Sequence, residues 1–394
     1  MRPLVLLAFV LAAPVTGQTP SPTGNVGLSD SARVSLLTML PGDEVYSLWG
    51  HNALRIEDAA AGLDRAYNYG TFSFEQPNFT LRFLSGRLDY ILDAAPYADE
   101  VAKYRFLGRP VIEQTLALEA ETVRALYDIL ETNALPQNRS YRYDFLRDNC
   151  STRLLEVVNQ ALTRTGHPPV RLEPPEQAVT FRELVRPYAA GHPLVDLGTM
   201  LGLGTPMDQE AQPREAIFLP DALSAALEDA TVDGEPLVAQ RDTVFWVEGA
   251  DVPEPAFPWP TALAWVLFVG TVTATVIRPR GRPSKAARWG DAALLAAVGG
   301  AGTILLLLWI ATDHYVTEAN VELLWMWPTH AVAAVAFLRP DLGTVGRRYA
   351  WAAAGATIVA LLGWALWPEP MHPALAPLGL LLTFRLAWRG QGES

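Results

Sequence analysis

The last third of the chain consists of hydrophobic runs long enough to cross a lipid bilayer. Five runs are found, at residues 257–277, 292–311, 321–338, 349–367 and 374–388. A helix of about 20 residues is roughly 30 Å long, which matches the hydrocarbon core of a bilayer. The last run is shorter than the others and contains Arg385. The sequence therefore predicts an all-α domain of five transmembrane helices within residues 257–394.

Positive charge is confined to alternate loops between these runs. Lys and Arg residues occur within 278–288, 339–348 and 385–389, whereas 313–320 and 368–373 contain neither. Loops that carry Lys and Arg stay on the cytoplasmic side of a membrane. This pattern predicts a cytoplasmic C-terminus and places everything from residue 18 to residue 257 outside.

Residues 1–17 have the pattern of a secretory signal peptide, which agrees with this orientation. A basic start precedes an apolar run of about 11 residues, too short to span a bilayer, and small residues follow up to Gly17. An uncleaved anchor is the alternative. Cleavage near Gly17 leaves an exported domain at 18–250, joined to the membrane domain by a proline-rich neck at 251–260.

Composition excludes several classes of function. The formal net charge is -12, which argues against a nucleic-acid partner because phosphate binding needs a basic face. The single cysteine, Cys150, excludes an internal disulfide framework and a Cys-ligated cluster. The six histidines show no metal-ligand spacing. We therefore expect no metal and no cofactor.

The exported domain has the pattern of an α+β fold with a small antiparallel sheet. Alternating polar and apolar residues predict a strand over 50–57, and the polar stretch 58–64 predicts a hairpin turn to a strand over 65–74. A further strand is expected over 111–118. Helical patterns cover 119–134, 151–162 and 218–230.

Cys150 precedes the predicted helix at 151–162, in the segment Leu146-Arg-Asp-Asn-Cys-Ser-Thr-Arg153. Unpaired N–H groups and the dipole at a helix start stabilise a thiolate. Such a position lowers the pKa of a cysteine below its usual value of about 8.5. Two interpretations remain open on position alone, a reactive nucleophile and a buried structural cysteine.

His51 begins the first predicted strand, where it can lie beside a helix-start cysteine and act as its base. Asn68, on the neighbouring strand, could orient the imidazole, or its amide could simply form a hydrogen bond at the edge of the strand. Asp148 is the second candidate for that role and could instead cap the helix. Tyr143 and the backbone N–H of Cys150 are candidates for stabilising an oxyanion.

Three motifs of the exported half together resemble the Lnb-type lipoprotein N-acyltransferases. They are Trp49-Gly-His51, Tyr67-Asn-Tyr-Gly-Thr-Phe72 and Asp148-Asn-Cys150. That domain resembles circularly permuted papain-like thiol enzymes of the NlpC/P60 type, in which the histidine strand precedes the cysteine helix. In the membrane half, 313–320 and Leu323-Leu-Trp-Met-Trp-Pro328 are similar to the family's loop and third-span signature.

The resemblance implies a set of site residues. Cys150, His51 and Asn68 would be catalytic, and residues in and around the same motifs would support them, namely Ser47, Trp49, Arg55, Tyr143, Asp148, Asn149 and Arg153. His314, Asn320 and Trp325 are candidates at the outer end of the membrane helices, since polar residues at that depth are functional by default. Anchoring at the membrane interface is the alternative for Trp325.

The resemblance also implies the reaction and its partners. An acyl chain of a membrane phospholipid would pass through a thioester on Cys150 to the α-amine of diacylglyceryl-cysteine on an apolipoprotein. The site would face the periplasm from the inner membrane. Two other functions stay open at this point: a membrane-tethered papain-like hydrolase, such as a cell-wall amidase or protease, and a non-catalytic membrane scaffold.

Overall fold

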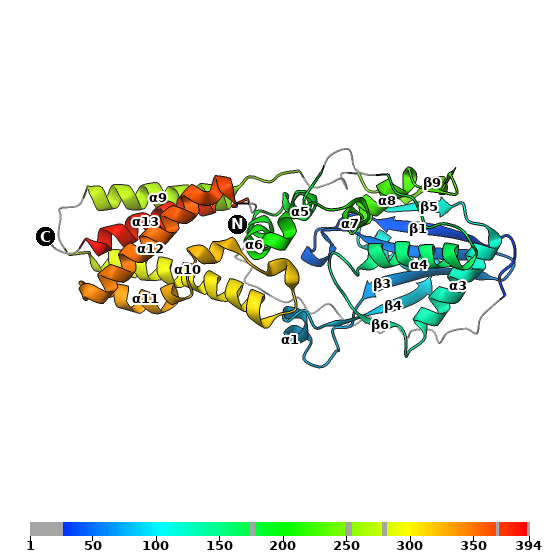
Figure 1. Ribbon diagram of the computed structural model, residues 1–394, viewed down its shortest axis with the longest axis horizontal. Helices are drawn as coiled ribbons and strands as arrows, with labels where there is room; N and C mark the ends of the chain where they lie inside the picture. Colours follow the sequence, from blue (N-terminus) through cyan, green and yellow to red (C-terminus); the bar gives the residue numbers. More distant parts are fainter. Residues whose placement is uncertain (1–26, 174–177, 249–253, 278–281, 368–369, 392–394) are drawn as a thin grey trace.

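The computed structural model describes residues 27–173, 178–248, 254–277, 282–367 and 370–391. The predicted signal peptide and the first residues of the predicted neck lie outside these ranges. Figure 1 shows two parts placed end to end along the long axis, a sheet domain formed by the residues up to 248 and a helical domain formed by the residues from 259 onward.

The sheet domain is built on a seven-stranded antiparallel sheet in the order β6-β4-β3-β2-β1-β5-β9. The strands are β1 (Arg33–Met39), β2 (His51–Asp58), β3 (Leu63–Thr71), β4 (Asp89–Pro96), β5 (Val111–Leu116), β6 (Ser140–Arg142) and β9 (Val238–Phe245). Strands β7 (Thr231–Val232) and β8 (Glu235–Pro236) form a separate ribbon. The predicted hairpin is confirmed as β2 and β3, but the sheet is larger than the small one expected.

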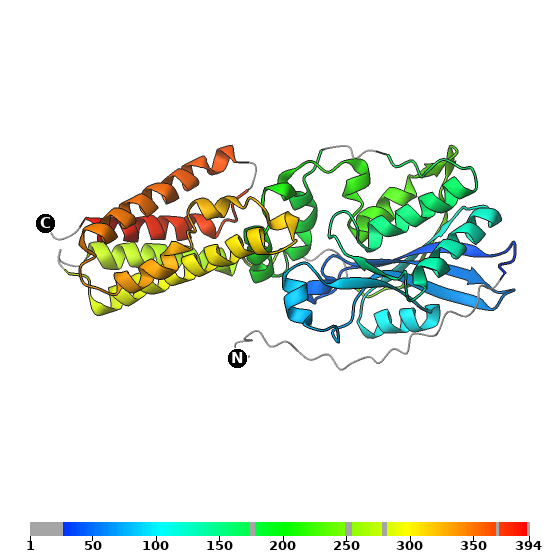
Figure 2. The same ribbon diagram turned by 60° about the horizontal axis from the view of Figure 1, so that its bottom comes forward.

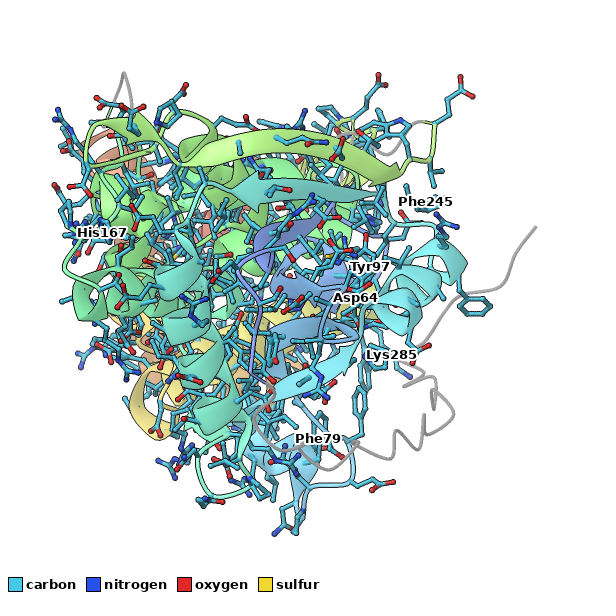
Figure 3. The ribbon with its side chains drawn as sticks, turned by 90° about the vertical axis from the view of Figure 1, so that its right-hand side faces the viewer. Asp64, Phe79, Tyr97, His167, Phe245 and Lys285 are labelled. Carbon is cyan, nitrogen blue, oxygen red and sulfur yellow. The ribbon has the colours of Figure 1, made fainter. Side chains whose placement is uncertain are left out.

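Helices cover both faces of the sheet. One face carries α3 (Ala120–Ala134), α4 (Cys150–Arg164) and α8 (Pro220–Glu228), and the other carries α2 (Tyr97–Phe106). Figure 3 looks at the sheet domain end-on and shows Tyr97 of α2 and His167, which follows α4, on opposite sides of the strands. The predicted alternation in β2 is confirmed, because Leu54 and Ile56 pack under α4 while Ala53 packs under α2.

Shorter helices fill the region between the sheet and the helical domain. They are η1 (Val45–Ser47), α1 (Phe79–Leu84), α5 (Phe181–Ala189), α6 (Pro193–Gly202), η2 (Thr205–Asp208) and α7 (Pro213–Ala216). Buried Arg182 of α5 fixes this region, since its guanidinium pairs with Asp208 and donates to the carbonyl oxygen of Gly204.

The helical domain contains α9 (Trp259–Val276), α10 (Lys285–Ala311), α11 (Thr329–Phe337), α12 (Gly343–Gly363) and α13 (Leu375–Gly390). The short turns η3 (Tyr315–Thr317), η4 (Val321–Leu324) and η5 (Trp364–Leu366) connect them. Within the described residues, α9 and α10 are the two helices long and apolar enough to cross a membrane by themselves.

The third predicted span, 321–338, is not one continuous helix. It consists of η4, a break at Pro328 and the nine-residue helix α11. Nine residues rise roughly 14 Å, about half the hydrocarbon thickness. The segment instead packs tightly on α10, where a Cβ added to Gly302 would lie 1.7 Å from the carbonyl oxygen of Met326.

Buried charge at one end of the helical domain explains the arginine in the last hydrophobic run. Arg385 and Arg389 both pair with Asp291 of α10, at 2.6 and 3.0 Å, and all three side chains are buried. A buried cation needs such a partner. The nearby Arg288 donates to the carbonyl oxygen of Leu338. Arg288, Arg385 and Arg389 therefore gather where α10 begins and α13 ends, at the end of the helices farthest from the sheet domain (Figure 1).

The opposite end of the helical domain is docked to the sheet domain. The backbone N–H of Asp313 donates to the carbonyl of Ser85 at 2.9 Å, and the side chain of Asn320 donates to the carbonyl of Leu201 at 2.7 Å. Figures 1 and 2 both place α1 beside the end of α10 that faces the sheet. These contacts fix the position of the sheet domain above the helices.

Candidate active site

Cys150 is the first residue of α4, and the turn before it fixes its position. The side chain of Asn149 accepts from the backbone N–H groups of Ser151 and Thr152, and the hydroxyl of Thr152 accepts from the backbone N–H of Asn149, which completes a capping box. Asn149 is buried and also donates to the carbonyl oxygens of Phe145 and Phe218. Asn149, and not Asp148, is therefore the cap of this helix.

Strands β2 and β3 meet the start of this helix. The hydroxyl of Ser151 donates to the side-chain oxygen of Asn52 at 2.8 Å, and the backbone N–H of Asn52 donates to the sulfur of Cys150. Gly70 of β3 lies on the other side, since a Cβ built there would be 3.6 Å from the Cβ of Cys150. Its φ of +89° is a second reason why glycine suits this position.

The hydrogen bond between His51 and Asn68 links the two predicted partners across β2 and β3. The Nε2 atom of His51 lies 3.2 Å from the Oδ1 atom of Asn68. Because an amide oxygen only accepts, the shared hydrogen belongs to Nε2. The Nδ1 atom of the neutral ring then keeps its lone pair, which is the form a general base needs.

The positive charge of Arg109 lies close enough to affect both the imidazole of His51 and the thiol of Cys150. The Nε atom of Arg109 donates to the carbonyl oxygen of Leu40 at 2.9 Å, while its Nη2 atom is buried without a hydrogen-bond partner among the described residues. His51 and Cys150 therefore lie at one end of β2, within the field of the same buried cation.

Burial keeps both groups neutral. It lowers the pKa of His51 to about 3, and the charges of Lys103 and Arg109 act in the same direction. Burial also raises the pKa of the Cys150 thiol above its ordinary value, although backbone N–H groups at the helix start oppose this. The expectation of a lowered thiol pKa is therefore wrong, because desolvation outweighs the helix start.

Tyr143, the candidate for stabilising an oxyanion, lies near Cys150. The same Cβ position at Gly70 is 3.4 Å from its Cε2 atom. The ring stacks on Tyr90 with a centroid distance of 4.4 Å. Burial raises the pKa of Tyr143 well above its ordinary value, so that its hydroxyl remains a neutral group able to donate.

The other supporting residues predicted from the motifs shape the surroundings of the site. Asp148 pairs with Arg153, whose guanidinium stacks over Tyr141, and so Asp148 is not the partner of His51. Ser47 donates to the carbonyl of Glu44 and closes a turn. Trp49 packs edge-on against Phe145.

Arg55 belongs to the far side of the sheet. It pairs with Asp64 and Glu113 at 2.7 and 3.0 Å, and its guanidinium lies over the ring of Tyr97. These contacts hold α2 against the sheet, so the role of Arg55 is structural.

The three candidates on the membrane side separate into different roles. His314 donates from Nε2 to the carbonyl oxygen of Phe83 at 3.2 Å and lines a cavity at the domain boundary. Asn320 is buried, and its side-chain amide donates to the carbonyl oxygen of Leu201 near the end of α6. Trp325 is only 1% exposed and donates to Glu322, so it is a buried packing residue and not an interfacial anchor.

A cavity of about 310 Å³ lies between the two domains, next to Tyr143. Trp49, Tyr90 and Phe145 line it from the sheet domain, and 313–316 line it from the helical domain. A larger hollow of about 660 Å³ runs along the solvent side of α4 and is lined by polar residues such as Arg147, Glu156 and Arg214. That hollow is open to solvent, whereas the smaller cavity is lined by Tyr143, whose ring lies near Cys150. We name the smaller one the interdomain cavity.

Sequence reasoning did not identify Asn52, Tyr90 or Arg109. Asn52 is adjacent to His51, and its position on the buried face of an alternating strand was an available signal, because a polar residue there needs partners. Tyr90 and Arg109 come from segments with no motif. Only the folded chain brings them to the site.

Comparison with known families matches both domains separately. The model of the Lnb N-terminal periplasmic domain matches residues 24–186, and the model of the Lnb transmembrane domain matches residues 253–390. Comparisons with curated proteins and with solved structures gave no match. The chain belongs to the Lnb family, as a membrane protein with a periplasmic α+β domain and a C-terminal helical membrane domain.

Proposed function

We propose that this protein is a thiol-dependent acyltransferase of the inner membrane that moves an acyl chain from a phospholipid to the α-amine of diacylglyceryl-cysteine on an apolipoprotein. The observation that carries the proposal is the His51–Asn68 hydrogen bond at the end of β2 where the helix-start cysteine meets Asn52. Together they form the nucleophile, base and orienting group of covalent catalysis. The family's association with lipoproteins supports the choice of substrate.

The order of the site residues supports a permuted papain-like arrangement. His51 is on β2 and Asn68 on β3, and both precede the helix α4 that carries Cys150. The strands are antiparallel neighbours, and α4 packs on them with its first turn at the histidine end. This gives the cysteine, histidine and asparagine the same relative roles as in papain-like enzymes.

In the first step, the sulfur of Cys150 attacks the ester carbonyl carbon of the phospholipid. The pair starts neutral, so the Nδ1 atom of His51 takes the thiol proton as the carbon–sulfur bond forms. The ester carbon–oxygen bond then breaks. His51 returns the proton to the departing alcohol oxygen, and the products are a lysophospholipid and an acyl thioester.

In the second step, the α-amine of the lipoprotein attacks the thioester carbonyl. The carbon–nitrogen bond forms, the carbon–sulfur bond breaks, and the amine proton passes through His51 to the sulfur. Both substrates are anchored in the bilayer, and the sheet domain is docked on the outer end of the membrane helices. Holding the reactants at one surface supplies part of the rate acceleration.

Mass spectrometry of lipoproteins tests this proposal in cells that contain this protein and no other candidate lipoprotein N-acyltransferase. We expect a blocked α-amine with the wild-type chain and a free α-amine with Cys150→Ser or His51→Ala. His167→Ala is a matched control, because His167 pairs with Asp233 at the far end of the sheet domain. Membrane levels of each variant are measured by immunoblotting.

The possible results of this experiment distinguish the acyltransferase from the hydrolase and from the non-catalytic scaffold. Wild-type acylation by Cys150→Ser would overturn the thiol mechanism and favour a scaffold. Free α-amines with the wild-type chain, together with peptide or cell-wall cleavage that needs Cys150, would favour the hydrolase. The same Cys–His pair serves a hydrolase, and only the second nucleophile differs.

A further inference from the structure

The interdomain cavity has a predominantly apolar lining and reaches Tyr143, which lies near Cys150. Leu88 and Val185 are buried in its wall, and Val316 and Leu203 complete it from opposite domains. At about 310 Å³ it is at the lower end of the range of roughly 300–1,000 Å³ for small-molecule pockets. A narrow apolar space of this size suits a hydrocarbon chain.

A row of aromatic rings leads from the surface of the molecule to Cys150. Phe83 stacks on Phe79 and Phe79 on Phe72, each with a centroid distance of 5.9 Å. Phe72 contacts Tyr90 edge-on at 5.3 Å, and Tyr90 stacks on Tyr143. Phe83, Tyr90 and Tyr143 also line the interdomain cavity. The ring contacts therefore run without a gap from Phe83 to Tyr143, and three of the five rings form part of the cavity wall.

The outer end of this wall lies where the membrane surface is expected. Ser85 and Arg87, next to α1, bind Asp313, which follows the membrane helix α10. Helix α1 and the turn before it expose large apolar side chains at that level: Phe74, Leu81, Phe83 and Leu84. Exposed apolar patches next to a membrane helix favour insertion into the lipid interface.

Building on the proposed acyl transfer, we propose that the interdomain cavity binds the acyl chain of the donor phospholipid. The chain enters from the outer leaflet past Phe83, lies along the aromatic row and brings its ester group to Cys150 at Tyr143. The length of the cavity then limits which acyl chains are transferred. Val316 and Thr199, on opposite walls, would contact the chain.

Narrowing the cavity tests the proposal with the full-length protein in lipid nanodiscs. The donors are phosphatidylethanolamines with two hexadecanoyl or two octanoyl chains, and the readout is the rate of acyl-adduct formation on Cys150 by mass spectrometry. We expect Val316→Trp to slow the hexadecanoyl donor about tenfold or more, while the octanoyl donor changes much less. Thr199→Phe, from the sheet domain, should act in the same direction.

Val332→Trp is the matched control, since Val332 is 77% exposed on α11 and does not line the cavity. It should leave the rates with both donors unchanged. An unchanged ratio of the two rates in Val316→Trp and Thr199→Phe would overturn the acyl-cavity proposal. If the wild-type chain forms no adduct with either donor, the proposed acyl transfer fails instead.

Photolabelling provides a second measurement that does not depend on catalysis. A phosphatidylethanolamine with a diazirine at the end of one hexadecanoyl chain is irradiated with the Cys150→Ala variant. We expect labelled peptides from 83–90 and 313–316, and less labelling of them in Val316→Trp/Cys150→Ala. Labels confined to the lipid-facing surfaces of α9 and α10 would contradict the proposal.

Discussion

At the scale of single residues, the site depends on which groups are neutral. Burial keeps the thiol of Cys150 protonated and the ring of His51 unprotonated, and Asn68 holds the ring by its Nε2 atom. A neutral pair in a water-poor site avoids the cost of burying a permanent ion pair. Charge then develops only during the reaction, in the field of Arg109, whose Nη2 atom has no hydrogen-bond partner in the part of the chain that the structure describes.

Replacing Asn68 by Ala should lower the rate of acylation about 100-fold, because a displaced ring is a poor base for the thiol. The Michaelis constant for the phospholipid should change little, since Asn68 acts through His51. Asn68→Asp keeps an acceptor for Nε2 and should retain more activity. Asn138→Ala, in an exposed loop after α3, is the control. Equal losses in Asn68→Ala and Asn68→Asp would contradict this role.

The neutral pair also predicts the pH dependence. The pKa of His51 is lowered to about 3, so the ring is an unprotonated base at every pH above that value. The raised pKa of Cys150 keeps the thiol protonated through neutral pH. Single-turnover acylation should therefore be nearly flat between about pH 5 and 8, where an ordinary histidine would titrate. A steep rise centred near pH 6.5 would indicate an unshifted histidine.

At the scale of elements, the sequence predicted the pieces that carry the chemistry. The hairpin β2–β3 follows from alternation and a turn, and α4 follows from its apolar stripe. Strand β1 was missed because it is buried on both faces, so that Val34 and Leu37 belong to different clusters and no alternation appears. The α11 segment was read as a full span because apolar composition does not reveal a break at a proline.

The first turn of α4 gives a prediction at this scale. Asn149→Ala removes the helix cap and two buried hydrogen bonds, and should lower the free energy of unfolding by about 1–3 kcal/mol. Gln160→Ala, on the exposed side of the same helix, should change it by less than about 0.5 kcal/mol. Thermal unfolding of the purified protein measures both. Equal melting temperatures for the two variants would show that the cap does not hold the helix.

At the scale of the whole molecule, the site joins two domains that are far apart in sequence. Arg87 and Asp313 are 226 positions apart and still form an ion pair at 3.0 Å. No local pattern could predict the interdomain cavity, because its walls come from the sheet domain and from the loop after α10. The motifs identified the reacting residues, and only the docked domains show where a lipid could approach them.

Close backbone contact at the domain boundary makes this docking testable. A Cβ added to Gly204 would lie 1.9 Å from the carbonyl oxygen of Glu318, so Gly204→Ala must push the domains apart. We expect slower acylation by membrane phospholipid with an unchanged melting temperature of the sheet domain. Gly198→Ala is the matched control, because nothing lies within 4 Å of its added Cβ and alanine favours a helix. Wild-type acylation by Gly204→Ala would show that docking is dispensable.

The most direct test of the account is the detection of an acyl group on Cys150. The full-length protein is mixed with phospholipid in the absence of lipoprotein, and the peptide that contains Cys150 is analysed by mass spectrometry. A thioester intermediate predicts a mass increase of one acyl chain that hydroxylamine removes, together with an equal amount of lysophospholipid. Lysophospholipid release without any acylated Cys150 peptide, or the same acyl group found on Cys150→Ala, would contradict the thioester mechanism.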